Sequence, residues 1–177
     1  MNTEQRQEIR EEEPKEKITT YTDEYKEGVL RFYDKLRNEF RDVDLGQSGQ
    51  GPNKANQEIG KKSENSDFWV ATNDENEVVG TAGLDDCGNG IGYFRSLYVD
   101  KSLRGKGVAK ELLSATVSFA KEKKYKVIFA ATMPKNTGVH KFNIKNGFRK
   151  IDVPPANSEK FRPGTVFFEM DLGEKKE

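Results

Sequence analysis

Residues 96–109 constrain the fold most, because the hydrophobic period changes there from that of a strand to that of a helix. Apolar and aromatic residues occupy most of 91–99 and stop at Asp100, as in a β-strand. After Gly107, apolar residues recur in two adjacent stripes, which predict one broadly buried face of a helix of about 20 residues. The apolar run 127–131 follows. A strand, a helix and a second strand in this order predict a parallel pair joined by a right-handed crossover.

The turn between this strand and this helix has the composition of a phosphate-binding site. The first N–H groups of a helix have no partner within the helix, and the helix dipole adds a partial positive charge there. Gly105 and Gly107 allow a phosphate to approach the main chain closely, and Arg104, Lys106 and Lys110 add positive charge. Two glycines can also serve only to ease a turn, so the turn by itself leaves both interpretations open.

Two motifs in this part of the chain resemble those of the GCN5-related N-acetyltransferases. Residues 104–109 have the pattern Arg-x-x-Gly-x-Ala after the strand residues 97–99, which is similar to the loop that holds the pyrophosphate of coenzyme A in that family. Residues 136–148 have the pattern Asn-x-x-Val-x-x-Phe-x-x-x-x-Gly-Phe, which is similar to the family's Asn-x-x-Ala helix and its Gly-Phe end. The two motifs occur in the family's order, and together they are more specific than either alone.

The resemblance implies a single α/β domain, which we expect to span residues 17–173. Its sheet would be mixed, with antiparallel N-terminal strands and a central parallel pair flanked by helices. The hydrophobic pattern agrees, because it predicts further strands at 18–21, 68–72, 78–84, 148–151 and 166–172, and helices after Asp23 and at 136–145. The charged segments 1–16 and 174–177 are predicted to be flexible ends.

The resemblance also implies a reaction, in which an amine attacks the thioester carbonyl of acetyl-CoA directly. In the family, the strand before the loop diverges from its neighbour, and its main-chain groups hold the cofactor. The residues that correspond to the family's acetyl-CoA contacts are Leu97, Tyr98, Val99, Arg104, Gly105, Lys106, Gly107, Val108, Ala109, Lys110 and Asn136.

The resemblance leaves open which residues move protons. Many members carry a tyrosine seven residues after the motif asparagine, where it protonates the leaving thiolate, but this chain has Asn143 there. An amide cannot donate a proton as a phenol can. Tyr98 is a candidate for the acid. Tyr93 and Asp86 are candidates for the base, although carboxylates such as Asp85 and Asp86 before a glycine are also typical of a turn.

Composition disfavours several other functions. Lys+Arg and Asp+Glu are equal at 30 each, so the chain has no basic footprint for nucleic acid. No apolar run approaches the ~20 residues of a membrane span, and the N-terminus lacks the apolar core of a signal peptide. We therefore expect a cytoplasmic protein that binds neither nucleic acid nor membrane. A single histidine, His140, expected on a solvated helix face, and a single cysteine, Cys87, predict no metal cluster and no intrachain disulfide.

Three functions remain compatible with the sequence. The favoured one is an acetyltransferase for a small amine or an amino acid; the second is an acetyltransferase for a protein lysine or N-terminus. The third is a non-catalytic module that senses acyl-CoA. It is suggested by Asn143 and by the lack of the glutamate that the family often carries, as a base, on the strand before the loop. Residues 41–57 are poor in apolar side chains, as in a mobile or functional loop. In the family that the chain resembles, this region covers the acceptor site, so the resemblance implies that residues 41–57 shape acceptor specificity. The apolar run 166–170 is compatible with a monomer or a homodimer.

Overall fold

The computed structural model describes residues 16–39 and 63–173. The predicted ends of the chain and the predicted specificity segment 41–57 lie outside the described residues, apart from residue 16.

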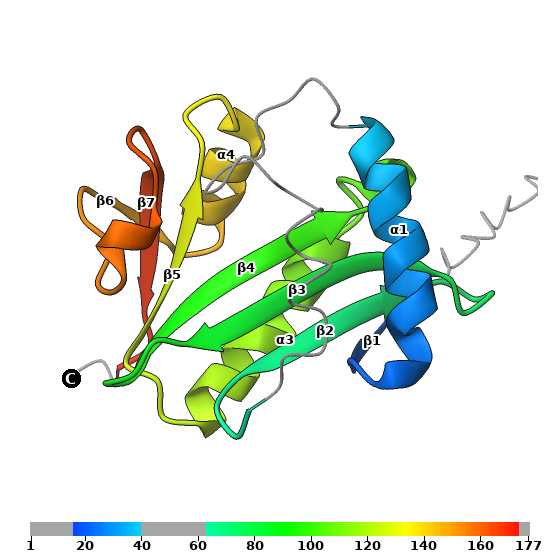
Figure 1. Ribbon diagram of the computed structural model, residues 1–177, viewed down its shortest axis with the longest axis horizontal. Helices are drawn as coiled ribbons and strands as arrows, with labels where there is room; N and C mark the ends of the chain where they lie inside the picture. Colours follow the sequence, from blue (N-terminus) through cyan, green and yellow to red (C-terminus); the bar gives the residue numbers. More distant parts are fainter. Residues whose placement is uncertain (1–15, 40–62, 174–177) are drawn as a thin grey trace, which may run out of the picture.

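A seven-stranded sheet forms the centre of the described molecule, with the strand order β1-β2-β3-β4-β5-β7-β6 (Figure 1). Its strands are β1 (Lys17–Thr20), β2 (Asp67–Thr72), β3 (Val78–Asp86), β4 (Ile91–Val99), β5 (Val127–Thr132), β6 (Arg149–Ile151) and β7 (Val166–Asp171). The pair β4–β5 is parallel and every other neighbouring pair is antiparallel. The predicted mixed α/β sheet is therefore confirmed.

Helices cover both faces of the sheet. The single turn η1 (Asp23–Tyr25) leads into α1 (Lys26–Glu39), which lies in front of the sheet in Figure 1, while α3 (Val108–Glu122) lies behind it. The short helix α4 (Thr137–Lys145) follows β5, and single turns occur at η2 (Lys101–Leu103) and η3 (Ser158–Lys160).

Helix α3 has 15 residues and is shorter than the predicted length. It stops because Lys124 adopts a left-handed conformation with φ 59°, and the N–H of Tyr125 then donates to the carbonyl of Ala120 at 2.9 Å. No glycine marks this helix end, so the apolar period alone does not locate it.

Each face of the sheet carries its own apolar cluster. In β2, Phe68 and Val70 pack with the buried face of α1, whereas Trp69 and Ala71 pack with the cluster that includes α3. The two clusters share the strands, as the alternation of side chains along a strand requires. Tyr33 of α1 is completely buried, although the helix pattern did not single it out.

Candidate functional site

Strands β4 and β5 pair only along their first halves. Their register runs from Ile91 opposite Val127 to Phe94 opposite Ala130. Beyond Phe94, β4 continues to Val99 without a partner on that side among the described residues, while β5 continues to pair with β7. The two strands diverge from this point toward their carboxyl ends, which Figure 1 shows as the opening between β4 and β5.

A β-bulge in β4 lies where the two strands part. Gly83 of β3 is opposite Arg95, but Thr81 is opposite Tyr98, so β4 contains one extra residue between these pairs. Ser96 lies in this interval with φ 54°, a conformation that costs a non-glycine residue about 1–3 kcal/mol. A bulge bends its strand and increases the local twist, so it turns the end of β4 away from β5.

The bulge also decides which main-chain groups point into the gap between β4 and β5. The N–H of Asp100 donates to the carbonyl of Val79 in β3 at 2.8 Å. Because main-chain groups alternate along a strand, those of Tyr98 also point toward β3, and the N–H groups of Leu97 and Val99 point into the gap. This geometry does not agree with the prediction that Tyr98 offers its N–H to the cofactor.

The loop after β4 presents unpaired N–H groups at the start of α3. Gly105 and Gly107 have φ of 82° and 99°, and the space that a Cβ would occupy at either position is open. Within the described residues, the N–H groups of Gly105, Gly107, Val108 and Ala109 donate to no acceptor. Those of Lys106 and Lys110 donate to the carbonyls of Leu103 and Gly107, at 3.2 and 2.9 Å. The side chains of Lys106 and Lys110 are exposed.

Asp100, directly after β4, the main-chain carbonyl of Val99 and two side chains of α1 hold this loop in place. Asp100 accepts hydrogen bonds from the N–H and the hydroxyl of Ser102, at 3.0 and 2.8 Å, and pairs with Lys35 of α1. Burial would raise the pKa of Asp100, but the Lys35 ammonium and the two Ser102 donors outweigh it and hold that pKa below its usual value. Arg104 donates from Nε to the carbonyl of Val99 at 3.1 Å and pairs with Glu39.

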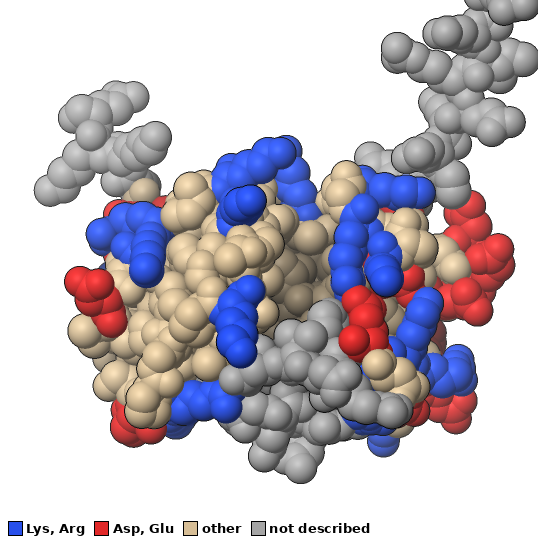
Figure 2. All heavy atoms as spheres, turned by 90° about the horizontal axis from the view of Figure 1, so that it is seen from above, with Lys and Arg blue, Asp and Glu red and all other residues tan. Residues whose placement is uncertain are grey.

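Helix α4 forms the other wall of the gap. Asn136 precedes α4 and donates from Nδ2 to the hydroxyl of Thr132, the last residue of β5, at 3.1 Å. Figure 2 views this end of the molecule and shows lysine and arginine side chains on both sides of a hollow with mostly uncharged walls. The gap between β4 and β5 therefore has unpaired N–H groups on one side and α4 on the other.

Two polar residues of α4 differ in their surroundings. Asn143 is only 2% exposed, and its Nδ2 has no hydrogen-bond partner within the described residues. The predicted solvated position of His140 is wrong: its ring is half-buried against Phe168 at 5.3 Å, and Nε2 lies 3.0 Å from the carbonyl of Met133.

The two tyrosine candidates lie on the sheet face that α1 covers. The ring of Tyr98 meets the ring of Tyr33 edge-on at 5.8 Å, and Leu97 and Val99 on either side pack into the opposite cluster. The ring of Tyr93 stacks on Phe129 at 5.1 Å, next to the last β4–β5 pairs.

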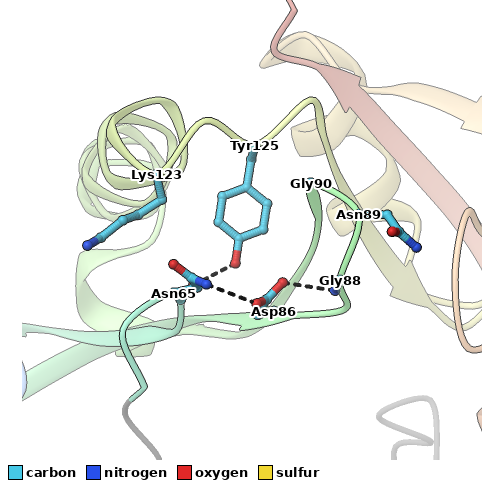
Figure 3. Close-up of a pocket in the computed structure, with 7 residues that line it drawn as sticks. All are labelled: Asn65, Asp86, Gly88, Asn89, Gly90, Lys123 and Tyr125. Carbon is cyan, nitrogen blue, oxygen red and sulfur yellow. Dashed lines mark hydrogen bonds between the residues drawn. The ribbon is translucent and has the colours of Figure 1, made fainter.

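Asp86 lies at the other end of the sheet. It is opposite Gly92, five residues before Leu97, which corresponds to roughly 15 Å along the strand. Figure 3 shows its carboxylate accepting from Asn65 at 3.3 Å and from the N–H of Gly88 at 2.9 Å, beside the shallow pocket of about 160 Å³ under Tyr125. The turn chemistry accounts for Asp86, so this geometry argues against its role as the base.

Asp85 is held in an ion pair, and Cys87 is not activated as a nucleophile. The carboxylate of Asp85 accepts from Nε of Arg95 at 2.6 Å, and the Arg95 side chain is only 5% exposed. Burial raises the pKa of the Cys87 thiol, and the charge of Asp85 raises it further. A high pKa disfavours the thiolate, so Cys87 lacks the activation of a nucleophile.

Two features that bear on the site were not recognised in the sequence. One is the Arg95–Asp85 pair, for which a charged residue within the apolar run 91–99 was the available signal. The other is the bulge at Ser96, for which the sequence has no glycine signal. Within residues 16–39 and 63–173, no cluster of acidic, histidine and cysteine side chains could hold a metal ion. No helix in the same ranges is long and apolar enough to cross a membrane.

Comparison with known proteins relates this geometry to a family. The model of the acetyltransferase (GNAT) family matches residues 29–148. No curated protein sequence matched the chain.

Solved structures of similar fold include acetyltransferases. A GNAT-family acetyltransferase from Staphylococcus aureus Mu50 is 27% identical, with a TM-score of 0.74 over 90% of this chain and 100% of that one. An acetyltransferase from Streptococcus agalactiae 2603 is 19% identical, with a TM-score of 0.70 over 88% and 98% of the two chains.

The ribosomal-protein-alanine N-acetyltransferase from Brucella melitensis is 18% identical, with a TM-score of 0.66 over 88% of this chain and 99% of that one. The latter two structures support the fold alone. The family match, which spans most of the chain, together with the diverging β4–β5 pair, shows that this protein belongs to the GNAT family of acetyltransferases.

Proposed function

We propose that this protein binds acetyl-CoA between β4 and β5 and transfers its acetyl group to a primary amine. One observation carries the proposal: the N–H groups of Leu97 and Val99 point into the gap, while those of Gly105, Gly107, Val108 and Ala109 lie at its mouth and find no acceptor among the described residues. These groups suit the elongated acyl-CoA molecule, because its amide-containing arm can pair with a strand and its pyrophosphate can bind at a helix N-terminus.

The residues of the proposed site divide this task between them. The N–H groups of Gly105, Gly107, Val108 and Ala109 hold the pyrophosphate, with the side chains of Lys106 and Lys110 adding positive charge at the exposed rim. Arg104 supports the loop through Val99 and Glu39. Asn136 closes the site from the end of β5. The amine nitrogen forms a bond to the thioester carbon, the carbon–sulfur bond breaks, and the N–H of Leu97 stabilises the charge on the carbonyl oxygen.

Proton transfer in this proposal falls to the two tyrosines on the α1 face. The amine must lose a proton and the leaving thiolate must gain one. Tyr98 is proposed as the acid that protonates the leaving thiolate. Tyr93 is proposed as the base that takes the proton of the attacking amine. Replacement of Tyr98 by Phe is expected to lower kcat and to remove the alkaline limb of its pH profile. An unchanged profile in both Tyr98→Phe and Tyr93→Phe would exclude the two phenols.

The proposed acceptor is a small amine or an amino acid. If acyl-CoA enters from the side of the α3 loop, the acceptor reaches the thioester from the opposite face, where the half-buried rings of Tyr93 and Phe161 pack on the buried ring of Phe129. The nearby charges of Asp85 and Arg95 neutralise each other. A surface that is aromatic and nearly neutral suits a small acceptor with apolar parts better than a strongly charged one.

A second function is favoured by one observation on α4. Asn143 is buried at the position where many members of the family have a tyrosine that acts as the general acid, and Asp85 is already paired with Arg95. A protein that binds acyl-CoA as a sensor needs no acid and no base. In that case binding would resemble that of an enzyme, but no amine or peptide would be acetylated.

The decisive experiment is calorimetric titration with acetyl-CoA of the wild type, Gly107→Glu and Gly88→Glu. Gly107→Glu places a carboxylate where the pyrophosphate is proposed to bind. Gly88 matches Gly107 because it also has a positive φ, of 81°, and open space around it, but it lies in the turn at the other end of the sheet. We expect Gly107→Glu to weaken binding by at least about tenfold and Gly88→Glu to bind like the wild type.

The outcomes separate the two functions. Binding by the wild type and Gly88→Glu, lost in Gly107→Glu, supports the acyl-CoA site, and release of free thiol with a panel of amines and peptides then distinguishes an enzyme from a sensor. Equal affinity of all three proteins would contradict the loop as the pyrophosphate site.

A further inference from the structure

Two buried hydroxyl groups hold the bulge in β4. The hydroxyl of Thr81 donates to the carbonyl of Ser96 at 2.8 Å. The hydroxyl of Tyr33, which comes from α1, lies 3.2 Å from the Thr81 hydroxyl oxygen. Tyr33 and Thr81 are both 0% exposed. This hydroxyl chain, Tyr33 and Thr81, therefore connects the helix on one face of the sheet to the strained residue at the bulge.

The direction of both hydrogen bonds follows from counting protons. A threonine hydroxyl has one proton, and that of Thr81 is donated to the Ser96 carbonyl, which can only accept. Tyr33 must therefore be the donor to Thr81. Burial raises the pKa of Tyr33, so its phenol keeps the proton that this arrangement requires.

The Ser96 side chain is held as well. Arg95 donates from Nη1 to the Ser96 hydroxyl at 3.2 Å, and the carboxylate of Asp85 fixes the same guanidinium through Nε. A serine with φ 54° is maintained only where its surroundings compensate for the strain. Here both its carbonyl and its hydroxyl are held by buried side chains.

The orientation of Leu97 depends on this arrangement. Its peptide N–H belongs to the same amide unit as the Ser96 carbonyl, so the two groups point in opposite directions. The Thr81 hydroxyl holds the carbonyl on the side of β3, and the N–H of Leu97 consequently faces the gap between β4 and β5.

We propose that Tyr33 and Thr81 are positioning residues, whose hydroxyl chain aims the N–H of Leu97 at the oxygen of the acyl group. The inference rests on the proposed acetyl-CoA site and adds to it the residues that orient its main-chain donor. It predicts that the hydroxyl groups, rather than the bulk of these side chains, determine the rate of acyl transfer.

Four variants test this inference. Thr81→Val and Tyr33→Phe remove one hydroxyl each and keep the shape, including the ring contact of Tyr33 with Tyr98. Thr81→Ser restores the hydroxyl. Thr116→Val is the matched control, because Thr116 is also 0% exposed and donates to a carbonyl, that of Leu112, at 2.9 Å, but lies within α3.

The first measurement is made by NMR and needs no turnover. We expect the Leu97 amide resonance of the wild type to shift when acetyl-CoA is added, and more than when CoA without the acetyl group is added. Thr81→Val is expected to move the Leu97 resonance in the absence of ligand, and Thr116→Val to leave it in place. An amide resonance that is the same in Thr81→Val and in the wild type would overturn the inference.

The second measurement is steady-state kinetics. Thr81→Val and Tyr33→Phe are expected to lower kcat by roughly tenfold to a hundredfold, with KM for acetyl-CoA changed less than about threefold. Thr81→Ser should recover most of the rate, and Thr116→Val should keep it. Equal kcat in Thr81→Val and Thr116→Val would also overturn the inference. If the wild type binds acetyl-CoA without turnover, acyl transfer is excluded and the NMR comparison alone decides whether Thr81 orients Leu97.

Discussion

Asp100 shows how a single residue connects the strand to the candidate phosphate loop. Its N–H completes the pairing with β3, and its carboxylate holds the Ser102 turn and the Lys35 ammonium. Because these partners lower the pKa of Asp100, its ionised form is favoured by folding. The charge of one buried carboxylate therefore stabilises the start of the loop.

Asp100→Asn is expected to lower the free energy of unfolding at pH 7 by roughly 1 kcal/mol, because the amide loses the charge that Lys35 and Ser102 stabilise. A lowered pKa in the folded state contributes stability that is complete above the unfolded value of about 3.9 and is lost as the pH falls through the folded value. The difference between the two proteins should therefore shrink below about pH 4. Urea unfolding between pH 7 and pH 3 measures this difference. The control is Asp74→Asn, because Asp74 is an exposed residue in a turn. A difference that is constant with pH would exclude the charge of Asp100 as its cause.

Among the elements, β4 is a strand whose two halves differ in their pairing. Its first half lies between β3 and β5, while its second half is paired only with β3 among the described residues. We expect the amides of Gly92 and Phe94 to exchange with deuterium slowly, and those of Leu97 and Val99 to exchange faster. Addition of acetyl-CoA should slow the latter two selectively. Hydrogen exchange at residue resolution tests this, and equal protection along β4 with and without ligand would contradict a binding role for its second half.

The elements also show what could be predicted from the sequence. The strands, the crossover helix and the glycine at the end of α4 followed from hydrophobic period and turn chemistry, because these are local properties. The end of α3 at Lys124 and the bulge at Ser96 did not, because both residues adopt positive φ without the glycine that normally signals it. The Arg95–Asp85 pair and the hydroxyl contact of Tyr33 with Thr81 join residues that only the folded sheet brings together.

At the scale of the whole molecule, the sheet makes the two apolar clusters interdependent. Strand β2 places Trp69 in one cluster and Phe68 and Val70 in the other, so neither face can unfold without exposing the opposite one. We expect urea unfolding followed by Trp69 fluorescence and by far-UV circular dichroism to give coincident transitions. Acetyl-CoA at about 100 times the Kd of the wild type should add about 2.7 kcal/mol to the unfolding free energy of the wild type and no more than about 1.4 kcal/mol to that of Gly107→Glu, whose binding is at least about tenfold weaker. If the fluorescence and circular dichroism transitions did not coincide, the two clusters would belong to two independently folding parts.

The position of β7 has a consequence for the order in which the site can form during synthesis. β7 is the last strand of the described residues, yet it lies between β5 and β6 and pairs with both. Until Val166–Asp171 leaves the ribosome, β6 has no strand to pair with, and the outer edge of β5 remains open. The wall that β4 and the α3 loop contribute can form early, whereas the wall that carries Asn136 is completed only by the final strand. A nascent chain therefore completes the proposed phosphate loop before it completes both walls of the proposed binding site.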